Sequence, residues 1–363
     1  MKKLSKRYLT LLLFLIVFAC NSKKELTIVP ELKYPFILSA DISKLPYIEN
    51  KNIVFYNSNN IEEDMLTTLS QNGINTIRLR LWHTPETSES SLEQVVAFSN
   101  KIHNLGLKLW LSVHYSDTWA DPGKQQIPFA WQNLTFGTLK DSVYEYTFKV
   151  ASETQADIFQ IGNEINPGFL LPQGDLYNNE IQFVELLKTA SNAIRDYSDS
   201  TKIMIHYAGL NGSSNFFDKI KSVDFDIIGL SYYPIWHGKS LNEVSNTVKS
   251  LSENYNKQIA IAETAYPFTL NWNDYTNNIV GLEEQLIPEF RPTPQGQFDF
   301  VSAIIDIVQT DSLGFGISYW GGEMVAFDGP TSQSGSPWEN QALYDFNNKA
   351  LPVLKAFSKT KSD

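Results

Sequence analysis

Short apolar runs alternate with longer amphipathic segments along most of this chain, and this alternation restricts the fold more than any other feature. Apolar runs bounded by turn residues are typical of strands buried on both faces, and strands that alternate with helices favour a parallel sheet. The candidate strands are residues 36–41, 74–82, 107–114, 158–164, 202–207, 225–232, 259–263 and 316–320. Eight such units within 363 residues predict an α/β fold, a single (β/α)8 TIM barrel.

The segments between the strands support the same prediction. Helical periodicity marks residues 61–71, 92–104, 183–197, 241–255 and 298–310. A doubly wound sheet would carry a glycine-rich phosphate turn after its first strand, but Asp41 is followed by Ile42-Ser43-Lys44. Long loops follow strands three, seven and eight, and in a barrel they should rise on the catalytic face and build the substrate groove. These loops are residues 115–134, 264–294 and 321–339.

The first twenty residues read as a targeting segment rather than as part of the fold. A basic stretch precedes an apolar one that is too short to span a membrane comfortably. It ends at Val17-Phe18-Ala19-Cys20, which resembles a bacterial lipobox, and Cys20 is the one cysteine of the chain. Plain secretion with cleavage near Ala19 is the alternative to lipidation. The predicted division is a lipoprotein signal peptide, a tether and a catalytic barrel, at residues 1–20, 21–33 and 34–363.

Either route exports the protein, and we expect a lipoprotein anchored in a bacterial membrane, at the cell surface or in the periplasm. No second long apolar run follows, so the membrane should be contacted only through the lipid. The net charge of −11 argues against nucleic-acid binding, which needs a basic surface, and favours a neutral glycan over an acidic one. A monomer is expected.

Two of the predicted strands end on a glutamate, Glu164 on the fourth and Glu263 on the seventh. Carboxylates at the carboxyl ends of barrel strands lie on the catalytic face, and retaining glycoside hydrolysis requires two of them. One such glutamate could equally be a cap or a salt-bridge residue, but two on these strands favour a catalytic pair. Three rival acids fall in loops and are interpreted as substrate-contacting or structural: Asp117, Asp121 and Glu323.

Residues near the pair suggest how the two carboxyl groups differ. Asn163 could hydrogen-bond the sugar 2-hydroxyl. Arg78 and Arg80 are two residues apart on strand two and so point to one side of the sheet, where one of them could keep Glu263 ionised. Tyr232, at the end of strand six, could donate its hydroxyl to the same carboxylate.

Histidine and tryptophan positions add to this interpretation. The five histidines show no i, i+4 pair, so no metal site is indicated, and His114 at the end of strand three is interpreted as a hydrogen-bonding residue of the groove. Several tryptophans fall just after predicted strands, where sugar rings could stack on them. They are Trp82, Trp119, Trp236, Trp272 and Trp320.

Several motifs resemble glycoside hydrolase family 53. The stretch from His114 to Gln125 is the most specific of them, whereas the two glutamate motifs alone would indicate only the wider clan A of glycoside hydrolases. The resemblance runs in order from about residue 36 to 356. The other matching motifs are Ser39 to Ser43, Asn75 to Trp82, Gly162 to Ile165, Ser231 to Pro234, Glu263 to Pro267 and Trp338 to Phe346.

The resemblance implies an arabinogalactan endo-β-1,4-galactanase that cuts β-1,4-galactan in pectin side chains with retention of configuration. It implies Glu164 as the acid/base and Glu263 as the nucleophile, in agreement with the roles above. Asp117 and Trp119 would belong to the galactan groove, and Trp320 would be its aromatic platform. The remaining residues expected to contact substrate are Asp41, Arg80, His114, Asn163 and Tyr232.

Two departures from the family pattern bear on the site. Trp320 is followed by Gly321-Gly322-Glu323 instead of a more apolar, often proline-containing stretch, so a different groove floor is expected. Some bacterial members of the family hold a structural calcium ion in the loop after strand seven. Residues 271–275 are poorer in carboxylates here, so that site is left open, and no cofactor is expected to be required.

Two other functions remain as alternatives. One is a different clan A endo-glycanase, such as a mannanase or cellulase. The other is a glycan-binding surface lipoprotein on a barrel without catalytic activity, which the presence of both glutamates disfavours.

Overall fold

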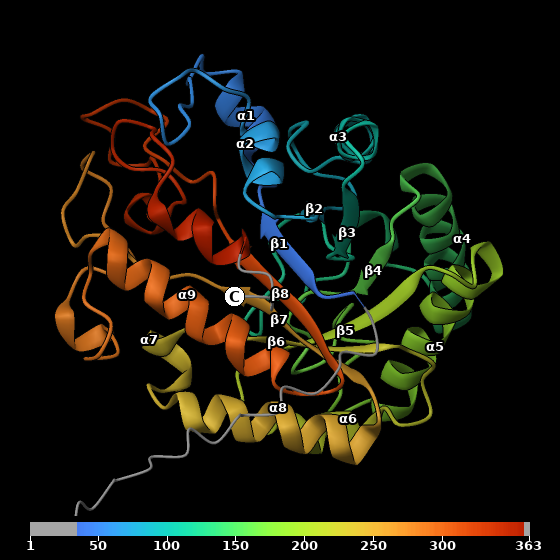
Figure 1. Ribbon diagram of the computed structural model, residues 1–363. Coiled ribbons are helices and arrows are strands. Elements are labelled where there is room, and N and C mark those ends of the chain that lie inside the picture. Colours follow the sequence, from blue (N-terminus) through green and yellow to red (C-terminus); the bar gives the residue numbers. More distant parts are fainter. Residues whose placement is uncertain (1–34, 359–363) are drawn as a thin grey trace, which may run out of the picture.

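The computed structural model describes residues 35–358, which form a closed barrel of parallel strands (Figure 1). Each strand pairs with the next along the chain, and the last closes the ring by pairing with the first. The predicted (β/α)8 fold is therefore confirmed. The strands are β1 Ile37–Asp41, β2 Thr76–Leu81, β3 Lys108–Val113, β4 Ile158–Ile161, β5 Lys202–Ala208, β6 Ile227–Ser231, β7 Gln258–Thr264 and β8 Gly314–Trp320.

Helices surround the barrel (Figure 1). Two of them have the predicted bounds, because each begins after a serine whose hydroxyl accepts a backbone N–H of the first turn: Ser91 before α3 and Ser240 before α8. The helices are α1 Leu45–Glu49, α2 Met65–Gln71, α3 Leu92–Asn104, α4 Phe136–Thr154, α5 Glu180–Tyr197, α6 Ser213–Lys219, α7 Pro234–His237, α8 Leu241–Tyr255 and α9 Pro294–Gln309.

The core has two layers. Outward-pointing strand residues pack against the helices in one large apolar cluster, and a smaller cluster lies inside the barrel around Trp110. Trp110 is fully buried and donates its indole N–H to Oε1 of Gln160 (3.0 Å). The barrel interior therefore changes from apolar to polar toward the carboxyl ends of the strands.

Strand β4 ends three residues earlier than predicted. It stops at Ile161, and Gly162 then takes a left-handed conformation with φ of +74°. A Cβ at Gly162 would lie 2.4 Å from Cγ2 of Ile165, so the turn requires glycine. Glu164 also has a positive φ, +49°, and lies beyond the strand rather than in it.

The predicted signal peptide, the lipidation site Cys20 and the tether lie outside the described residues. Within residues 35–358, no helix is long and apolar enough to cross a membrane. The described chain enters the barrel at the amino end of β1, whereas the predicted catalytic glutamates lie past the carboxyl ends of β4 and in β7.

Candidate active site

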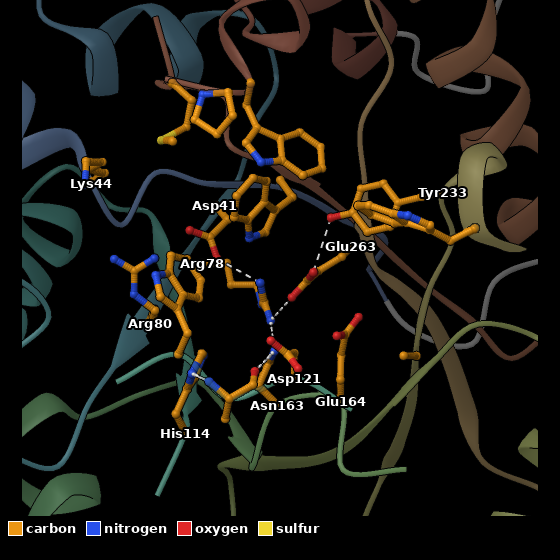
Figure 2. Close-up of a pocket in the computed structure, with 18 of the residues that line it drawn as sticks. Asp41, Lys44, Arg78, Arg80, His114, Asp121, Asn163, Glu164, Tyr233 and Glu263 are labelled. Carbon is orange, nitrogen blue, oxygen red and sulfur yellow. Dashed lines mark hydrogen bonds and ion pairs between the residues drawn. The ribbon is translucent and has the colours of Figure 1, made fainter. Parts of the chain in front are cut away.

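A cavity of about 690 Å³ opens where the strands end, and both predicted glutamates line it. Figure 2 shows Glu164 and Glu263 side by side, with Arg78 reaching toward Glu263 from the opposite side. The loops after β3 and β8 contribute to the wall, as predicted, with Trp119 and Trp338 among their residues.

The loop after β7 does not line this cavity, contrary to the prediction. It packs behind the loop after β8 instead, where Tyr275 N–H donates to Ser332 O (2.8 Å) and Gly335 N–H donates to the Thr276 hydroxyl (2.7 Å). Residues of α7, which follows β6, occupy the wall on that side.

Arg78 is the arginine that contacts Glu263. Its guanidinium is fully buried and donates to Oε1 of Glu263 (2.8 Å), to Oδ2 of Asp41 (2.8 Å) and to Oδ1 of Asn163 (3.0 Å). Burial raises the pKa of Glu263, and the positive charge of Arg78 opposes that effect. The one cation therefore neutralises part of two carboxylates and joins β1, β2 and β7.

The tyrosine that contacts Glu263 is Tyr233, so the prediction of Tyr232 in this role is wrong. Tyr233 donates its hydroxyl to Oε2 of Glu263 (3.2 Å), whereas Tyr232 donates to the carbonyl of Gly238 (3.0 Å) and does not line the cavity. Strand β6 ends at Ser231, so successive residues beyond it point in different directions. A one-residue error there moves the hydroxyl from the cavity to the core.

Glu164 differs from Glu263 in having no cation among its hydrogen-bond partners. Its Oε1 accepts the hydroxyl of Ser231 (2.5 Å). Burial, and then the negative charge of Glu263, raise the pKa of Glu164 to about 8. Because Arg78 and Tyr233 both donate to Glu263, the proton that this pair keeps at neutral pH lies on Glu164. One carboxyl group is thus an acid and the other an anion.

Asn163, just before Glu164, lines the cavity, but both ends of its amide are engaged. Its Oδ1 accepts from Arg78 (3.0 Å) and its Nδ2 donates to the carbonyl of Ala120 (2.9 Å). Gln125 donates to the carbonyls of Asn163 (2.7 Å) and Glu164 (3.2 Å), which holds the backbone of both residues. Asn163 therefore ties the Glu164 turn to Arg78 and so to Glu263.

The three other strand-end residues predicted to contact substrate also line the cavity: Asp41, Arg80 and His114. Arg80 lies against the ring of Trp119, with its guanidinium carbon 3.9 Å from the ring centroid, and donates to Glu89 (2.8 Å). His114 accepts the backbone N–H of Ala120 at Nδ1 (3.1 Å). Burial lowers the pKa of His114 well below its usual range, so its ring is neutral.

Four tryptophans form a continuous aromatic wall along the cavity. Ring centroids are 6.1 Å apart between Trp119 and Trp320, 4.5 Å between Trp320 and Trp338, and 6.2 Å between Trp338 and Trp236. Trp338 was missed as a site residue because it follows no strand. Trp82 and Trp272, predicted as stacking residues, do not line the cavity.

Comparisons with known proteins agree with this geometry. The model of the family described as "Glycosyl hydrolase family 53" matches residues 37–357. The chain belongs to glycosyl hydrolase family 53.

Several relatives are similar over nearly their whole length. The "Arabinogalactan endo-beta-1,4-galactanase" of Cellvibrio japonicus is 34% identical over 89% of this chain and 90% of that protein. The "Endo-beta-1,4-galactanase" of Bacillus subtilis is 30% identical over 90% of this chain and 86% of that protein. The solved structure of the Ignisphaera aggregans GH53 catalytic domain superposes with a TM-score of 0.84 at 38% identity, covering 91% of this chain and 97% of that one.

In this family 53 enzyme the three rival acids have different positions. Asp121 lines the cavity, and its Oδ1 accepts the backbone N–H of Gly123 (2.7 Å). Asp117, expected in the groove, does not line the cavity; it accepts the backbone N–H groups of Thr84 (2.9 Å) and Phe129 (2.8 Å) and so joins two loops. Glu323 is buried behind the wall, and burial raises its pKa to about 8.

The loop expected to hold calcium in some family members offers few ligands here. Asp274 and Glu339 lie together, each with one buried carboxylate oxygen that has no hydrogen-bond partner in the described part of the chain. Among residues 35–358 no three His, Cys, Asp or Glu side chains gather where they could hold a metal ion. Calcium takes six to eight oxygen ligands, which include amide and backbone carbonyl oxygens and water, so these two carboxylates would supply only part of a calcium site.

We expect the substitution Arg78→Met to destabilise this enzyme strongly. Methionine fills similar space without the charge, so Asp41 and Glu263 would stay buried with no cation beside them. Removing one partner of a buried ion pair costs about 3–5 kcal/mol in the free energy of unfolding, which urea titration would measure.

Arg195→Met is the control for this substitution. Arg195 pairs with Asp224 and Asp226 nearer the surface, so its loss should cost about 1 kcal/mol or less. Equal losses would contradict the role assigned to Arg78.

Proposed function

We propose that this protein is an endo-acting, retaining galactanase that cleaves β-1,4-galactosidic bonds in the galactan and arabinogalactan side chains of pectin. The observation that carries the proposal is the unequal carboxyl pair in one cavity: a protonated Glu164 beside an ionised, Arg78-bound Glu263. The names of the family 53 relatives from Cellvibrio japonicus and Bacillus subtilis support galactan as the substrate.

In the proposed first step, Glu263 attacks the anomeric carbon and Glu164 gives its proton to the departing glycosidic oxygen. The aglycone leaves and a galactosyl ester of Glu263 forms. In the second step, Glu164, now a carboxylate, takes a proton from water, and that water attacks the anomeric carbon and releases Glu263. Two displacements give a product with the original configuration.

The aromatic wall supports binding of a glycan chain rather than of a single sugar. Sugar rings stack on aromatic faces, and four tryptophans in sequence along the cavity offer several such positions. Trp119 and Trp236 remain 40% and 54% exposed, so the outer positions are open to solvent. An open groove of this kind suits attack within a chain.

The test is product analysis on unbranched β-1,4-galactan, with β-mannan and cellulose assayed in parallel. Short galacto-oligosaccharides released early from galactan, with little release from the other two, are the expected result. Proton NMR of the first products should show the β-anomer before mutarotation. Preferential cleavage of mannan or cellulose would contradict the substrate, and α-anomers would contradict retention.

The pH dependence of kcat/KM should be bell-shaped. Activity needs Glu263 ionised, so it should rise with pH as Glu263 loses its proton. Activity also needs Glu164 protonated, and because its pKa is raised to about 8, activity should fall as pH passes about 8. Initial rates on galactan across this range measure both limbs. A basic limb centred near the ordinary pKa of a glutamate would contradict the assignment.

We propose further that the protein is an exported bacterial lipoprotein attached through Cys20. The sequence that ends at Cys20 supports this. The barrel geometry is compatible with it, since the described chain enters at the amino end of β1, the rim opposite the cavity. An anchored enzyme would then face away from the membrane.

The substitution Cys20→Ser should remove the lipid and release the protein from the membrane fraction. Radiolabelled palmitate incorporation and fractionation of the producing cells measure the two effects. Activity of the released protein on galactan should be unchanged, because the barrel is the same. Membrane attachment of the serine variant would contradict the proposal.

A further inference from the structure

A buried chain of hydrogen bonds leads from the backbone of Glu164 to its own carboxyl group. The N–H of Glu164 donates to Nδ1 of His206 (3.4 Å), Nε2 of His206 lies 2.9 Å from Oγ of Ser231, and that hydroxyl donates to Oε1 of Glu164 (2.5 Å). His206 and Ser231 are fully buried on the adjacent strands β5 and β6. Neither lines the cavity, and neither is among the site residues predicted from the sequence.

The surroundings of Nδ1 determine which nitrogen of His206 carries the hydrogen. The backbone N–H of Glu164 donates to Nδ1. Nε2 of Gln160 also lies 3.1 Å from Nδ1, but it is closer to the hydroxyl of Ser112 (2.9 Å) and the carbonyl of Gly162 (3.0 Å). The Gln160 amide cannot be reversed, because its Oε1 accepts from Trp110 (3.0 Å) and from Arg78 (3.2 Å). The direction of a backbone N–H is fixed by the chain, so Nδ1 must be the acceptor in its bond with Glu164.

One acceptor also lies near Nδ1 of His206, the Oδ1 of Asn163 at 3.2 Å. That oxygen already accepts from Arg78 (3.0 Å), so it does not need a hydrogen from the ring. Burial and the charge of Arg78 lower the pKa of His206 well below its usual range, so the ring is neutral. The hydrogen of the neutral ring is therefore on Nε2, where it is donated to Ser231.

The direction of the remaining bonds follows. Because Ser231 accepts from His206, its own hydroxyl hydrogen must go to Oε1 of Glu164. Oε1 is then an acceptor whether Glu164 is ionised or neutral, and the acidic hydrogen must lie on Oε2. Oε2 has no hydrogen-bond partner among residues 35–358, and Glu164 lines the cavity.

We propose that Ser231, oriented by His206, is a positioning residue that keeps the catalytic proton of Glu164 on Oε2, the oxygen available to substrate. The inference rests on the proposed function. In the first step the proton passes from Oε2 to the glycosidic oxygen, which takes the electron pair of the breaking C–O bond. In the second step water returns a proton to Oε2. The Ser231 bond to Oε1 stays in place throughout, so neither step requires the chain of bonds to rearrange.

The variant Ser231→Ala tests this inference. Without the hydroxyl, the proton of Glu164 can lie on either oxygen and a donor to the carboxylate is lost. We expect kcat/KM on galactan to fall about tenfold at the wild-type optimum, a fraction of the usual contribution of acid catalysis. The basic limb of the pH profile should move to higher pH, because the Ser231 hydrogen bond lowers the pKa of Glu164.

A second substrate separates positioning of the proton from general damage to the site. Dinitrophenolate leaves without a proton, so kcat/KM on dinitrophenyl β-1,4-galactobioside should change by no more than about twofold in Ser231→Ala. The matched control is Ser318→Ala, another fully buried barrel serine, whose hydroxyl has no partner among the described residues. That control should behave as wild type on both substrates.

Two results would overturn the inference: an unchanged basic limb in Ser231→Ala, or equal losses on galactan and on the dinitrophenyl substrate. Failure of the proposed function is distinguishable, because the unaltered protein would then release no sugar from galactan. A thermal unfolding curve close to that of Ser318→Ala establishes that the variant is folded.

Discussion

The substitution Glu263→Gln should abolish galactan hydrolysis, with kcat reduced on the order of 10⁴-fold or more. The amide has the size of the carboxyl group but no negative charge and little nucleophilicity, so the galactosyl ester cannot form. Galactan binding should persist, since the aromatic wall is untouched. Initial rates of reducing-end release and affinity electrophoresis in galactan gels measure the two properties.

A buried glutamate outside the proposed chemistry provides the control for this experiment. Glu323 lies behind the cavity wall, and since burial raises its pKa to about 8 it is mostly neutral at pH 7. Its Oε1 accepts the backbone N–H of Lys44 (2.7 Å), a role that a glutamine oxygen can keep. Glu323→Gln should therefore retain activity within a few-fold. If that variant were the inactive one, the roles of these acids would have to be reassigned.

The barrel could be predicted from the sequence because its determinants are local. Apolar runs reveal strands buried on both faces, and serine caps fix the start of α3 and α8. The exact end of β4 could not be predicted, since Phe159 to Ile165 reads as one continuous run. The structure ends that strand at Ile161, because the chain turns at Gly162, where a side chain would collide with Ile165.

The sequence predicted which types of side chain form the site, but not which of them contact one another. Arg78 and Arg80 share one side of β2, and the sequence could not say which of the two reaches Glu263. Their depth in the barrel determines this: Arg78 contacts Glu263, whereas Arg80 contacts Glu89 and Trp119.

The wrong prediction of Tyr232 in place of Tyr233 has a similar origin. Both tyrosines follow β6 directly, and the direction of the backbone beyond the end of the strand places the hydroxyl of Tyr233, not that of Tyr232, against Glu263.

Contacts between distant segments were beyond sequence reasoning altogether. Ser231 and His206 lie within predicted strands and look like ordinary barrel residues. Their importance appears only when β5 and β6 are paired and Glu164 folds back over them. Trp338 is a comparable case, because its loop approaches Trp320 only in the folded barrel.

The substitution Glu164→Ala should affect galactan and a substrate with a good leaving group differently. Hydrolysis of galactan should fall by about 10²–10⁴-fold, because its leaving group needs a proton. Dinitrophenyl β-1,4-galactobioside should still form the ester with Glu263, because dinitrophenolate leaves unaided. Turnover should then stall at that ester, since no base activates water, and a burst of dinitrophenolate should be visible by stopped-flow absorbance.

Azide, an anion that needs no base, should restore turnover of Glu164→Ala. It attacks the ester on the face opposite Glu263, so the product should be a β-galactosyl azide. In Glu263→Ala the same anion can replace only the missing nucleophile, and one displacement on a β-glycoside gives the α-azide. NMR of the two products therefore assigns the two carboxyl groups independently of rate. The same anomer from both variants would show that Glu164 and Glu263 do not act from opposite faces of the sugar.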